Sequence, residues 1–543
     1  MNPDGVSYLD LADAYTRGDW GRAVNAYFSP LYSWLLAAAM WLVPPTMDTE
    51  FTIAHVVSFA GYLAALVAFE LFLSAFMRAY ERAESREGEP AMPRPGWLVA
   101  GYSLFIWSAL HLNTLILVTP DMWVEAWAYL AAALLVRARL GDTRWLTFAS
   151  LGLVLGVGYL TKAAMLPIGL AFLVGAALAV RRWSLALPRA ALALAAMLLV
   201  SAPFIAAISR AKGRLTIGEV STLAYAWFVN GVAGDEDGGS FMPILHWHGS
   251  PPGLGAPEHP TRIVSESPRI YEFAAPVGGT YPPWYDASYW YEGLRVRPAP
   301  LQQMQLLVSN GFGYIVALSP IIAVLLVPVW LLGRGAITRA SIREYGYLLV
   351  PAAAPLAMYA SIYTEGRYVA PFVVILVLGT IAVLRLHRAP DPRRLGGAIA
   401  GALATVLLVT LYIELRGGLG TAARDLLGRR TVPDVPAAIA HGVRAAGVRE
   451  GEPVALIGNG LMAYWARLAR VRIIAELPRR EADRYWAGDD SLKSRVIQTF
   501  ARTGARAIIA ERVPPWAAAD GWKAIGETGY VIYPLSTGAP PSP

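Results

Sequence analysis

The sequence predicts a polytopic α-helical membrane protein that ends in a small α/β domain. Of its 543 residues, 56% are hydrophobic and only 16% are charged, and the mean hydropathy is positive. This balance lies outside the usual range for soluble globular proteins. Apolar runs repeat through residues 52–415, and each is close to the roughly 20 residues that a bilayer-spanning helix needs. Beyond them, short β-rich runs alternate with helical patterns, as in an α/β domain.

We expect about ten spans, separated by charged or Pro- and Gly-rich breaks. They lie at residues 52–77, 97–118, 122–138, 145–161, 163–181, 188–208, 309–332, 345–361, 368–386 and 396–415. The pair around Lys162 can be two short helices or one long broken helix. Pro167 and the Gly-rich stretch before Lys162 favour a hairpin of two helices.

The basic residues predict the orientation of the bundle. Arginines cluster in the connections at 78–94, 137–144, 181–189, 334–343 and 385–394, which are therefore cytoplasmic by the positive-inside rule. The opposite short connections hold only Lys162 and Arg367 as basic residues. The N-terminal stretch, the long segment before residue 309 and the C-terminal tail then lie on the extracytoplasmic side of a cell (inner or plasma) membrane. Because these clusters explain the net charge of +7, membrane lipid is an expected partner and nucleic acid is not.

This orientation divides the chain into five segments. They are a first extracytoplasmic loop (1–51), transmembrane helices (52–208), an extracytoplasmic aromatic-rich loop (209–308), transmembrane helices (309–416) and an extracytoplasmic α/β domain (417–543). Within the first loop, "YFSPLYSWLLAAAMWLVPP" is short, Pro-bounded and rich in Trp and Tyr, which is typical of a helix lying in the membrane interface. As an eleventh span it would instead place the opening acidic stretch in the cytoplasm.

Charged residues gather on the predicted extracytoplasmic side. They are Asp4, Asp10, Asp121, Glu125 one turn below Asp121, Lys162, Glu365 and Arg367. A charge within the membrane costs at least about 2.5 kcal/mol at a helix centre unless it is paired or faces a cavity. Carboxylates beside one lysine and one arginine suit a reaction that uses a carboxylate base and a cationic clamp for a phosphate leaving group. Interface snorkelling and helix capping, with Asp121 after Pro120 as a cap, is the structural alternative.

Four stretches resemble a known superfamily. "PDGVSYLDLADAYTRGDW" followed by "FSPLYSWLLAAAM" resembles the first external loop of GT-C superfamily glycosyltransferases of the protein O-mannosyltransferase and aminoarabinose transferase type, and Asp4 and Tyr8 fall on its Asp-x-x-x-Tyr pattern. "LVTPDMWVEAWAYLAAALL" resembles the second external loop, "GVGYLTKAAMLPIGLA" the Leu-Thr-Lys hairpin, and "TEGRYVAPFVVILVL" the Arg-Tyr start of a late span. The resemblance covers roughly residues 1–415, and it implies a GT-C-like bundle.

The resemblance also implies an activity. It is that of a dolichyl- or polyprenyl-phosphate-sugar-dependent hexosyl- or pentosyltransferase, which moves the sugar to a hydroxyl of a glycan, lipid or protein acceptor with inversion and without an assigned metal or cofactor. Asp4 would be the catalytic base or the carboxylate that orients the acceptor, with Asp10 as the fallback, and Asp121 would be a second site carboxylate. The substrate-binding residues would be Tyr8, Glu125, Lys162, Glu365, Arg367 and Tyr368.

In the resembling family a transmembrane helix precedes the Asp-x-x-x-Tyr element. Here only three residues precede Asp4. We therefore expect that an N-terminal transmembrane helix is missing from this chain.

The loop at 209–308 is densest in aromatic residues at "GGTYPPWYDASYWYEG". Trp284, Tyr285 and Trp290 are candidates to stack on sugar or isoprenoid faces. The alternative is that they form a small core that folds this Pro- and Gly-rich loop over the bundle. "LHWHG" offers His246 and His248 as a metal pair, but no third ligand is evident nearby, which favours an ordinary pair of loop histidines.

In the tail, "PVALIG", "VRIIAE", "ARAIIAER" and "YVIYPL" predict strands of a parallel sheet. "GNGLMA" after the first strand, with Glu476 ending the second, imitates a G-x-G-x-x-A dinucleotide fingerprint. The same glycines are needed simply to turn from strand into helix. Acceptor recognition, or packing over the site, is therefore favoured over nucleotide binding.

Two functions from other classes compete with the glycosyltransferase. A transporter or flippase of a lipid-linked saccharide also has polar groups inside a bundle, but transporters tend to show internal repeats and helices broken at the bilayer midplane. No repeat is evident here, and the charges gather at one face. A non-catalytic membrane scaffold would leave the external carboxylates, lysine and arginine without a role.

Overall fold

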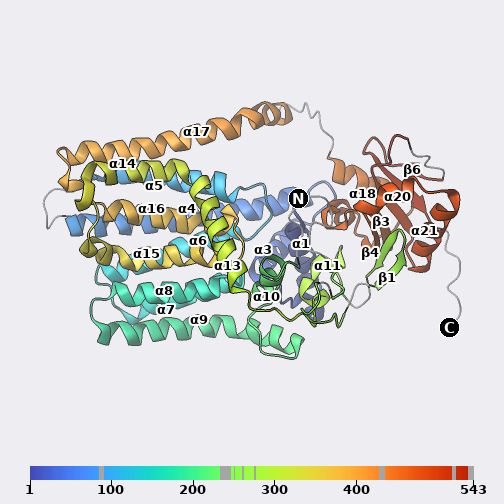
Figure 1. The fold of residues 1–543 in the computed structure, drawn as a ribbon, viewed down its shortest axis with the longest axis horizontal. Coiled ribbons are helices and arrows are strands. Elements are labelled where there is room, and N and C mark those ends of the chain that lie inside the picture. Colours follow the sequence, from blue (N-terminus) through green and yellow to red (C-terminus); the bar gives the residue numbers. More distant parts are fainter. Residues whose placement is uncertain are drawn as a thin grey trace.

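A computed structural model of the chain describes residues 1–84, 91–232, 246–249, 251–259, 262–273, 277–426, 434–516 and 521–535, with only the backbone described at 334 and 417–426. The ribbon is a long helical bundle followed by a region of short elements and then a mixed sheet with helices (Figure 1). The N-terminal residues lie between the bundle and the sheet (Figure 1).

Each of the ten predicted segments is helical. The helices are α4 (Glu50–Glu84), α5 (Arg94–Trp107), α6 (Asp121–Arg139), α7 (Trp145–Thr161), α8 (Met165–Ala179), α9 (Trp183–Lys212), α14 (Ser319–Leu332), α15 (Arg339–Ala360), α16 (Gly366–Val383) and α17 (Pro392–Leu426). By length and composition, 4 helices of the described chain can cross a membrane, or up to 5 with one bent pair. The predicted count of about ten spans is not confirmed by this measure, because several of the bundle helices are shorter.

The predicted span at 309–332 is wrong as a single helix. It is divided between α13 (Pro300–Ala317) and α14, which meet at an 80° bend. Pro320 lies in the first turn of α14, and a proline there cannot continue the hydrogen-bond ladder of a preceding helix. As a result α13 crosses the end of the bundle while α14 runs along it (Figure 1).

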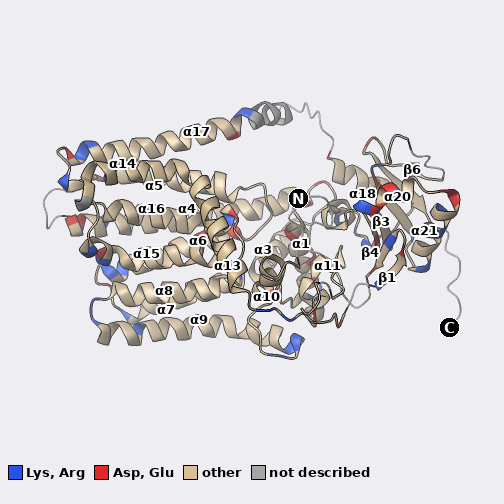
Figure 2. Ribbon diagram, in the orientation of Figure 1, with Lys and Arg blue, Asp and Glu red and all other residues tan. Residues whose placement is uncertain are grey.

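The predicted hairpin around Lys162 is confirmed. α7 ends at Thr161 and α8 begins at Met165, and the two helices pack on one another. The described parts of the five arginine-rich connections therefore lie at one end of the bundle, where basic residues gather in Figure 2. The connections that hold Asp121, Lys162 and Arg367 lie at the opposite end, beside the N-terminal residues.

The opening residues, predicted as a first extracytoplasmic loop with one interfacial helix, are mostly helical, and their place relative to the membrane stays a prediction. They form α1 (Pro3–Thr16), α2 (Trp20–Ala23) and α3 (Pro30–Leu42). α1 begins with Pro3 and carries Asp4 in its first turn, two features that favour a helix start. Residues 5–12 of α1 are buried, packed against α3. The interfacial position of α3 stays a prediction, and Trp41 on this helix is 76% exposed.

The aromatic-rich loop contributes short elements between the bundle and the sheet. They are α10 (Val220–Ala224), the π-helix η2 (Tyr225–Val229), β1 (Arg262–Glu266), β2 (Arg269–Glu272), α11 (Pro282–Tyr285) and α12 (Ala287–Trp290). One core buries aromatic residues of this loop together with residues of α1 and α3 and of the C-terminal sheet. The structure thus ties the loop to both neighbours.

The C-terminal residues form strands at all four predicted runs. The elements are α18 (Val435–Ala445), β3 (Pro453–Gly458), α19 (Tyr464–Leu468), β4 (Arg472–Pro478), α20 (Arg479–Trp486), α21 (Asp490–Arg502), β5 (Ala507–Glu511), β6 (Lys523–Ala524) and β7 (Tyr530–Pro534). The sheet order is β1-β2-β4-β3-β5-β7-β6.

The strand directions only partly follow the prediction of a parallel sheet. β3 is parallel to β4 and to β5, whereas β7 is antiparallel to β5. The prediction is wrong for β7, because no helix crosses over between β5 and β7 in the described chain. β2 from the aromatic-rich loop adds to the other side through antiparallel pairing with β4, so that one sheet is built from two distant stretches of sequence.

Candidate active site

Four elements bring charged side chains together at the bundle end opposite the arginine-rich connections. Asp4 lies in the first turn of α1, Asp121 is the first residue of α6, Lys162 directly follows α7, and Arg367 is in the first turn of α16. Because α6 and α16 both begin at this end, the positive ends of their helix dipoles also face it. The arrangement gathers four of the residues that the sequence singled out.

Arg367 and Lys162 join the two aspartates. Lys162 Nζ lies 2.6 Å from Asp121 Oδ1. Arg367 Nη1 is 3.6 Å from Asp121 Oδ2, and Arg367 Nη2 is 3.6 Å from Asp4 Oδ2. The Asp121 side chain is only 2% exposed, while that of Asp4 is 27% exposed. Asp4 is therefore the carboxylate of the pair that an incoming molecule reaches more easily.

Glu365 fixes the direction of the arginine. Arg367 Nε donates to Glu365 Oε2 at 2.5 Å, and the Tyr363 hydroxyl donates to Glu365 Oε1 at 2.6 Å. The ring of Tyr368 lies below Lys162, whose Nζ is 3.8 Å from the ring centre, a favourable cation–π distance. Both predicted residues, Glu365 and Tyr368, thus hold the two cations in place.

Asp4 has a perturbed ionisation. Trp284 Nε1 donates to Asp4 Oδ1 at 3.3 Å. Burial raises the pKa of the Asp4 carboxyl, and although Arg367 and Lys162 oppose this rise, Glu365 and Asp121 reinforce it. The net pKa is above the ordinary aspartate value. A carboxylate with a raised pKa accepts a proton more readily, as a general base must.

Glu125 and Tyr8, two further predicted site residues, are both buried. Glu125 is fully buried, and its Oε1 accepts from Asn113 Nδ2 at 2.9 Å. Tyr8 is buried with its ring edge-on to Phe28 and Tyr32. The substrate-binding role of these two buried residues stays a prediction.

Asp10 lies apart from the other predicted residues, in a second cluster. Its carboxylate accepts from Thr280 N at 2.6 Å and Thr280 Oγ1 at 2.9 Å, and it receives Arg467 Nη1 at 2.9 Å. Burial raises the Asp10 pKa, while Arg467 and the Thr280 N–H oppose the rise. We name this cluster the clasp; it consists of Asp10, Asp13, Glu50, Arg467 and Arg470. The clasp joins α1 and α4 to the C-terminal part of the chain.

The three aromatic candidates of the loop differ in their surroundings. Trp290 donates to Pro282 O at 2.8 Å and Tyr285 to Arg22 O at 2.6 Å, and both side chains are buried. Their position fits the alternative that they form the core of the loop. Trp284 is buried as well, but it reaches the candidate site through Asp4.

The two histidines of "LHWHG" have different surroundings. His246 stacks on Tyr271 with ring centres 4.0 Å apart, and its Nε2 lies 3.7 Å from Glu476 Oε2. His248 is exposed. Within the described ranges, no three His, Asp or Glu side chains converge in a way that could hold a metal ion.

The dinucleotide-like motif has a packing role. Glu476, its acidic residue, accepts from Gly460 N at 3.1 Å and from the Tyr281 hydroxyl at 2.5 Å. A Cβ atom on Gly460 would lie 2.3 Å from the Tyr281 ring. The glycine thus makes room for the Tyr281 ring, in keeping with the packing alternative.

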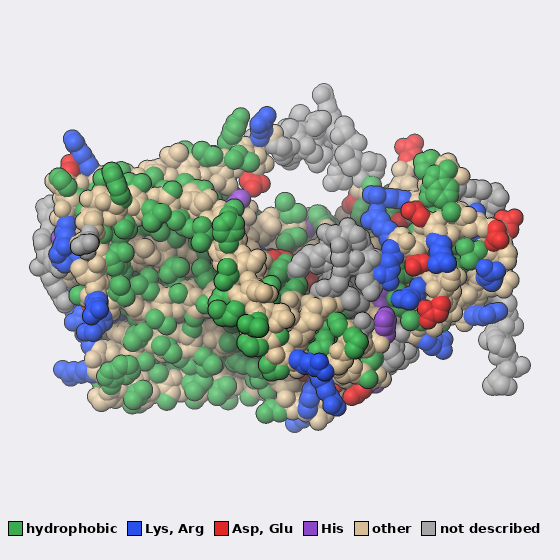
Figure 3. Space-filling model, viewed as in Figure 1, with side chains coloured by type: hydrophobic (Ala, Val, Ile, Leu, Met, Phe, Trp, Pro, Cys, Tyr) green, Lys and Arg blue, Asp and Glu red, His purple; other side chains and the backbone are tan. Residues whose placement is uncertain are grey.

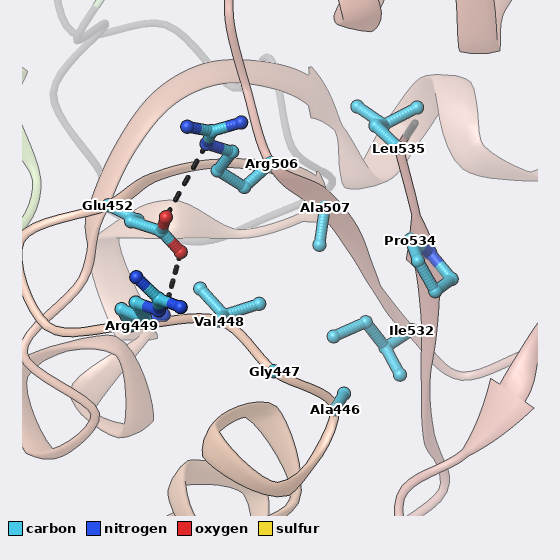
Figure 4. A pocket seen from close by; sticks show the side chains of 10 residues that line it. All are labelled: Ala446, Gly447, Val448, Arg449, Glu452, Arg506, Ala507, Ile532, Pro534 and Leu535. Atoms are coloured by element: carbon cyan, nitrogen blue, oxygen red, sulfur yellow. Dashed lines mark hydrogen bonds and ion pairs between the residues drawn. The ribbon is translucent and has the colours of Figure 1, made fainter. Parts of the chain in front are cut away.

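A surface depression of about 390 Å³ lies in the C-terminal part, between Arg449, Arg506 and Leu535 (Figure 4). Glu452 lies between the two arginines, accepting from Arg449 N at 2.7 Å and lying 3.5 Å from Arg506 Nε. The depression is at the amino ends of β3 and β5, whereas ligands of such sheets bind at the carboxyl ends. It is also far from the ion pairs in sequence and contains none of the predicted site residues.

Two residues of the site were missed by sequence reasoning. Tyr363 could have been found, because it lies two residues before Glu365 in "YTEGRY". Asn113, which bonds to Glu125, carried no such signal: it ends the π-helix η1 (Ser108–Asn113), a local widening of the helix that follows α5. π-helical turns are frequent near functional sites.

No protein-family model matches the chain, and no curated protein matches it. Solved structures do match at low identity. ArnT from Cupriavidus metallidurans is 13% identical, with 98% of this chain and 93% of that chain covered, at a TM-score of 0.48 in the apo state and 0.47 bound to undecaprenyl phosphate. The Archaeoglobus fulgidus oligosaccharyltransferase in complex with Zn and sulfate is 13% identical, with 94% of this chain and 64% of that chain covered, at a TM-score of 0.49.

Proposed function

We propose that this chain is a GT-C-type membrane glycosyltransferase that moves a sugar from a polyprenyl-phosphate donor to an acceptor hydroxyl on the extracytoplasmic side of the membrane. One observation carries the proposal: Asp4, Asp121, Lys162 and Arg367 converge at the bundle end opposite the arginine-rich connections. Such a group combines a base with a receptor for a phosphate leaving group.

The two cations are suited to the donor phosphate. Arg367 is anchored by its Nε on Glu365, while its Nη atoms lie 3.6 Å from the aspartates, beyond the normal hydrogen-bond range. The Nη groups can therefore donate to phosphate oxygens without releasing the anchor. Lys162 adds a second positive charge. In this proposal both residues stabilise the negative charge that grows on the leaving phosphate.

The proposed reaction is one displacement. The acceptor oxygen forms a bond to the anomeric carbon of the sugar, while the bond from that carbon to the phosphate oxygen breaks. Asp4 takes the hydroxyl proton, and the bond electrons leave with the polyprenyl phosphate. A single displacement inverts the anomeric configuration, and it needs one base, in contrast to the paired carboxylates of glycosidases. Asp121 keeps the two cations together.

The surface of the bundle supports a lipid-linked donor. Hydrophobic side chains cover the bundle in Figure 3, while charged residues appear mainly at its end and on the C-terminal part. Exposed apolar residues on α4 include Leu63, Val67 and Leu71. In a bilayer, a polyprenyl chain would lie alongside such a surface with its phosphate at the level of Lys162 and Arg367. Glycans, lipids and proteins are the proposed acceptor classes.

A donor screen tests this proposal. The protein in lipid nanodiscs is mixed with a panel of polyprenyl-phosphate hexoses and pentoses and with extracts that contain acceptors, and mass spectrometry follows both products. We expect release of free polyprenyl phosphate with transfer from one donor class, and loss of both in Asp4→Asn. Movement of intact lipid-linked saccharide across liposomes without release would instead support a transporter.

A further inference from the structure

Trp284 contacts the candidate base directly. Its Nε1 donates to Asp4 Oδ1 at 3.3 Å, and its backbone carbonyl accepts from Ser7 Oγ on the same helix as Asp4 at 3.2 Å. Both the side chain and the backbone of Trp284 are therefore hydrogen-bonded to α1. The indole N–H lies on a carboxylate oxygen other than the one that faces Arg367.

The indole ring itself is covered by other aromatic rings. Trp227 is stacked on it with ring centres 6.0 Å apart, Tyr27 lies at 5.3 Å, and Phe28 meets it edge-on at 6.4 Å. Trp284 is 8% exposed. A ring enclosed in this way has no free face for a sugar, so its contribution to the site is made through the N–H group.

The segment around Trp284 is anchored on the C-terminal sheet. We name residues 280–285 the strap. At its start, Thr280 O accepts from Ile473 N of β4 at 2.9 Å. The next residue, Tyr281, donates to Glu476 of β4 at 2.5 Å, and Glu476 is held in turn by Gly460 N. The strap thus runs from the sheet to Asp4 within six residues of chain.

We propose that Trp284 is a positioning residue for Asp4, and that the C-terminal sheet sets its position through the bond between Tyr281 and Glu476. This inference rests on the proposed function, because it assigns the aspartate a base role. Glu476 then acts on the reaction through the strap. The sheet fixes the position of the strap, and the strap keeps the Asp4 carboxylate ionised and in one orientation.

The expected sign follows from the charges around Asp4. The groups that act on it are Arg367, Glu365, Lys162 and Asp121, with the hydroxyls of Tyr8, Tyr27, Tyr363 and Tyr368. An N–H donor stabilises the ionised carboxylate. Loss of the donor raises the Asp4 pKa, so that the base becomes protonated at a higher pH and activity is lost earlier as the pH falls.

The test uses three single variants. Trp284→Phe removes the N–H and keeps an aromatic ring. Tyr281→Phe removes only the hydroxyl that anchors the strap. Trp522→Phe is the matched control, since Trp522 packs with Tyr485 and Tyr533 in a core of the C-terminal part that contains no residue of the strap. The acidic limb of the pH profile of kcat/KM is measured for each variant and for the unaltered protein.

We expect Trp284→Phe to move the acidic limb to higher pH by about half a unit to one unit, in keeping with the loss of one hydrogen bond to a partly exposed charged group. Tyr281→Phe should move it in the same direction by a smaller step, and Trp522→Phe should not move it. An unmoved limb in Trp284→Phe overturns the positioning role. An unmoved limb in Tyr281→Phe overturns the role of the sheet.

A second measurement keeps this inference separate from the proposed function. Thermal unfolding of Asp4→Asn, Trp284→Phe and the double variant forms a double-mutant cycle that needs no substrate. Positive coupling near neutral pH, falling as the pH is lowered, is expected if the N–H binds the ionised carboxylate. Absence of coupling contradicts the inference even where sugar transfer is found, and coupling without transfer contradicts only the proposed function.

Discussion

Asp121 is an almost fully buried carboxylate whose charge is balanced by two cations. Lys162 lies at 2.6 Å and Arg367 at 3.6 Å. Removing one partner of a buried ion pair leaves an uncompensated charge, which costs about 3 kcal/mol or more. The stability of this part of the bundle should therefore depend on both charges being present together.

This predicts a specific pattern in Lys162→Met. The variant should unfold at a clearly lower temperature, because Asp121 loses its hydrogen-bonded cation. The double variant Asp121→Asn with Lys162→Met should be less destabilised than the sum of the single changes, since neither charge is then left alone. Thermal unfolding in detergent checks this. Additive effects would show that the pair is not coupled.

Glu365 offers a pH test with a defined sign. Burial is the largest cause of the raised pKa of Asp4, and the negative charge of Glu365 raises it further. Glu365→Gln removes that charge, so the Asp4 pKa should fall and the base should stay ionised to lower pH. The acidic limb of kcat/KM is expected to move to lower pH, opposite to Trp284→Phe. A limb that moves upward would contradict the electrostatic description of the site.

At the residue scale, the charged groups of the site could be predicted from the sequence. Tyr363 and Asn113, which hydrogen-bond to Glu365 and Glu125, were missed. Asp4, Asp121, Lys162, Glu365 and Arg367 could be selected because a charge near a membrane span is costly without a purpose. Asp10 was selected on the same ground, but tertiary contacts with Thr280 and Arg467 place it in the clasp. Partners that distant in the chain leave no trace in local sequence.

At the scale of elements, the clasp connects α1 and α4 to α19. Arg467 is 3% exposed and is bonded to Asp10, Asp13 and Glu50. Burial raises the pKa of Asp13, but Arg467 and Arg470 outweigh burial and keep it below the ordinary value. The contribution of this ionised carboxylate is lost as the pH falls through its lowered pKa. The attachment of α19 is thus expected to weaken only at strongly acidic pH.

A charge deletion in the clasp tests its role. Arg467→Met should lower the unfolding temperature strongly, because it leaves three carboxylates without their shared cation and breaking such a group costs about 3–5 kcal/mol. Arg484→Met is the matched control, since Arg484 is 59% exposed and its ion pair among the described residues is with Glu481 on its own helix, a contact worth at most about 1 kcal/mol. Equal effects of both variants in thermal unfolding would contradict the clasp.

Helices could be predicted where the sequence contains a long apolar run. Every long apolar run became a helix, because a buried or lipid-facing backbone must satisfy its own hydrogen bonds. α1 was missed as a helix because its burial comes from α3 and from the aromatic-rich loop, not from a strong pattern of its own. The break between α13 and α14 was missed although Pro320 marks it, since apolar composition continues through the bend.

At the scale of the whole molecule, the two ends of the bundle differ in charge. The arginine-rich connections lie at one end, and the candidate site and the C-terminal sheet lie beyond the other (Figure 2). The positive-inside rule predicts that the arginine-rich end is cytoplasmic. The overall architecture could be predicted from this alternation, whereas the joining of β2 to β4 across the sequence could not.

Cysteine labelling can check the predicted orientation directly. The chain has no cysteine, so a single introduced thiol has no background. In intact cells, a membrane-impermeant maleimide should label Ser494→Cys on α21 and should fail to label Ala340→Cys at the start of α15, both at exposed positions. Lysed cells should label both. The reverse pattern in intact cells would place the candidate site in the cytoplasm.

In the proposed reaction Asp4 belongs to the active site and Asp10, on the same helix, does not. Single-turnover release of polyprenyl phosphate from a donor in proteoliposomes tests it, with Asp4→Asn compared with Asp10→Asn at equal amounts of folded protein. Loss of the base should slow release in Asp4→Asn by about 10²-fold or more, while Asp10→Asn should lower thermal stability and keep the rate per folded molecule near that of the unaltered protein. A wild-type rate in Asp4→Asn would contradict the claim.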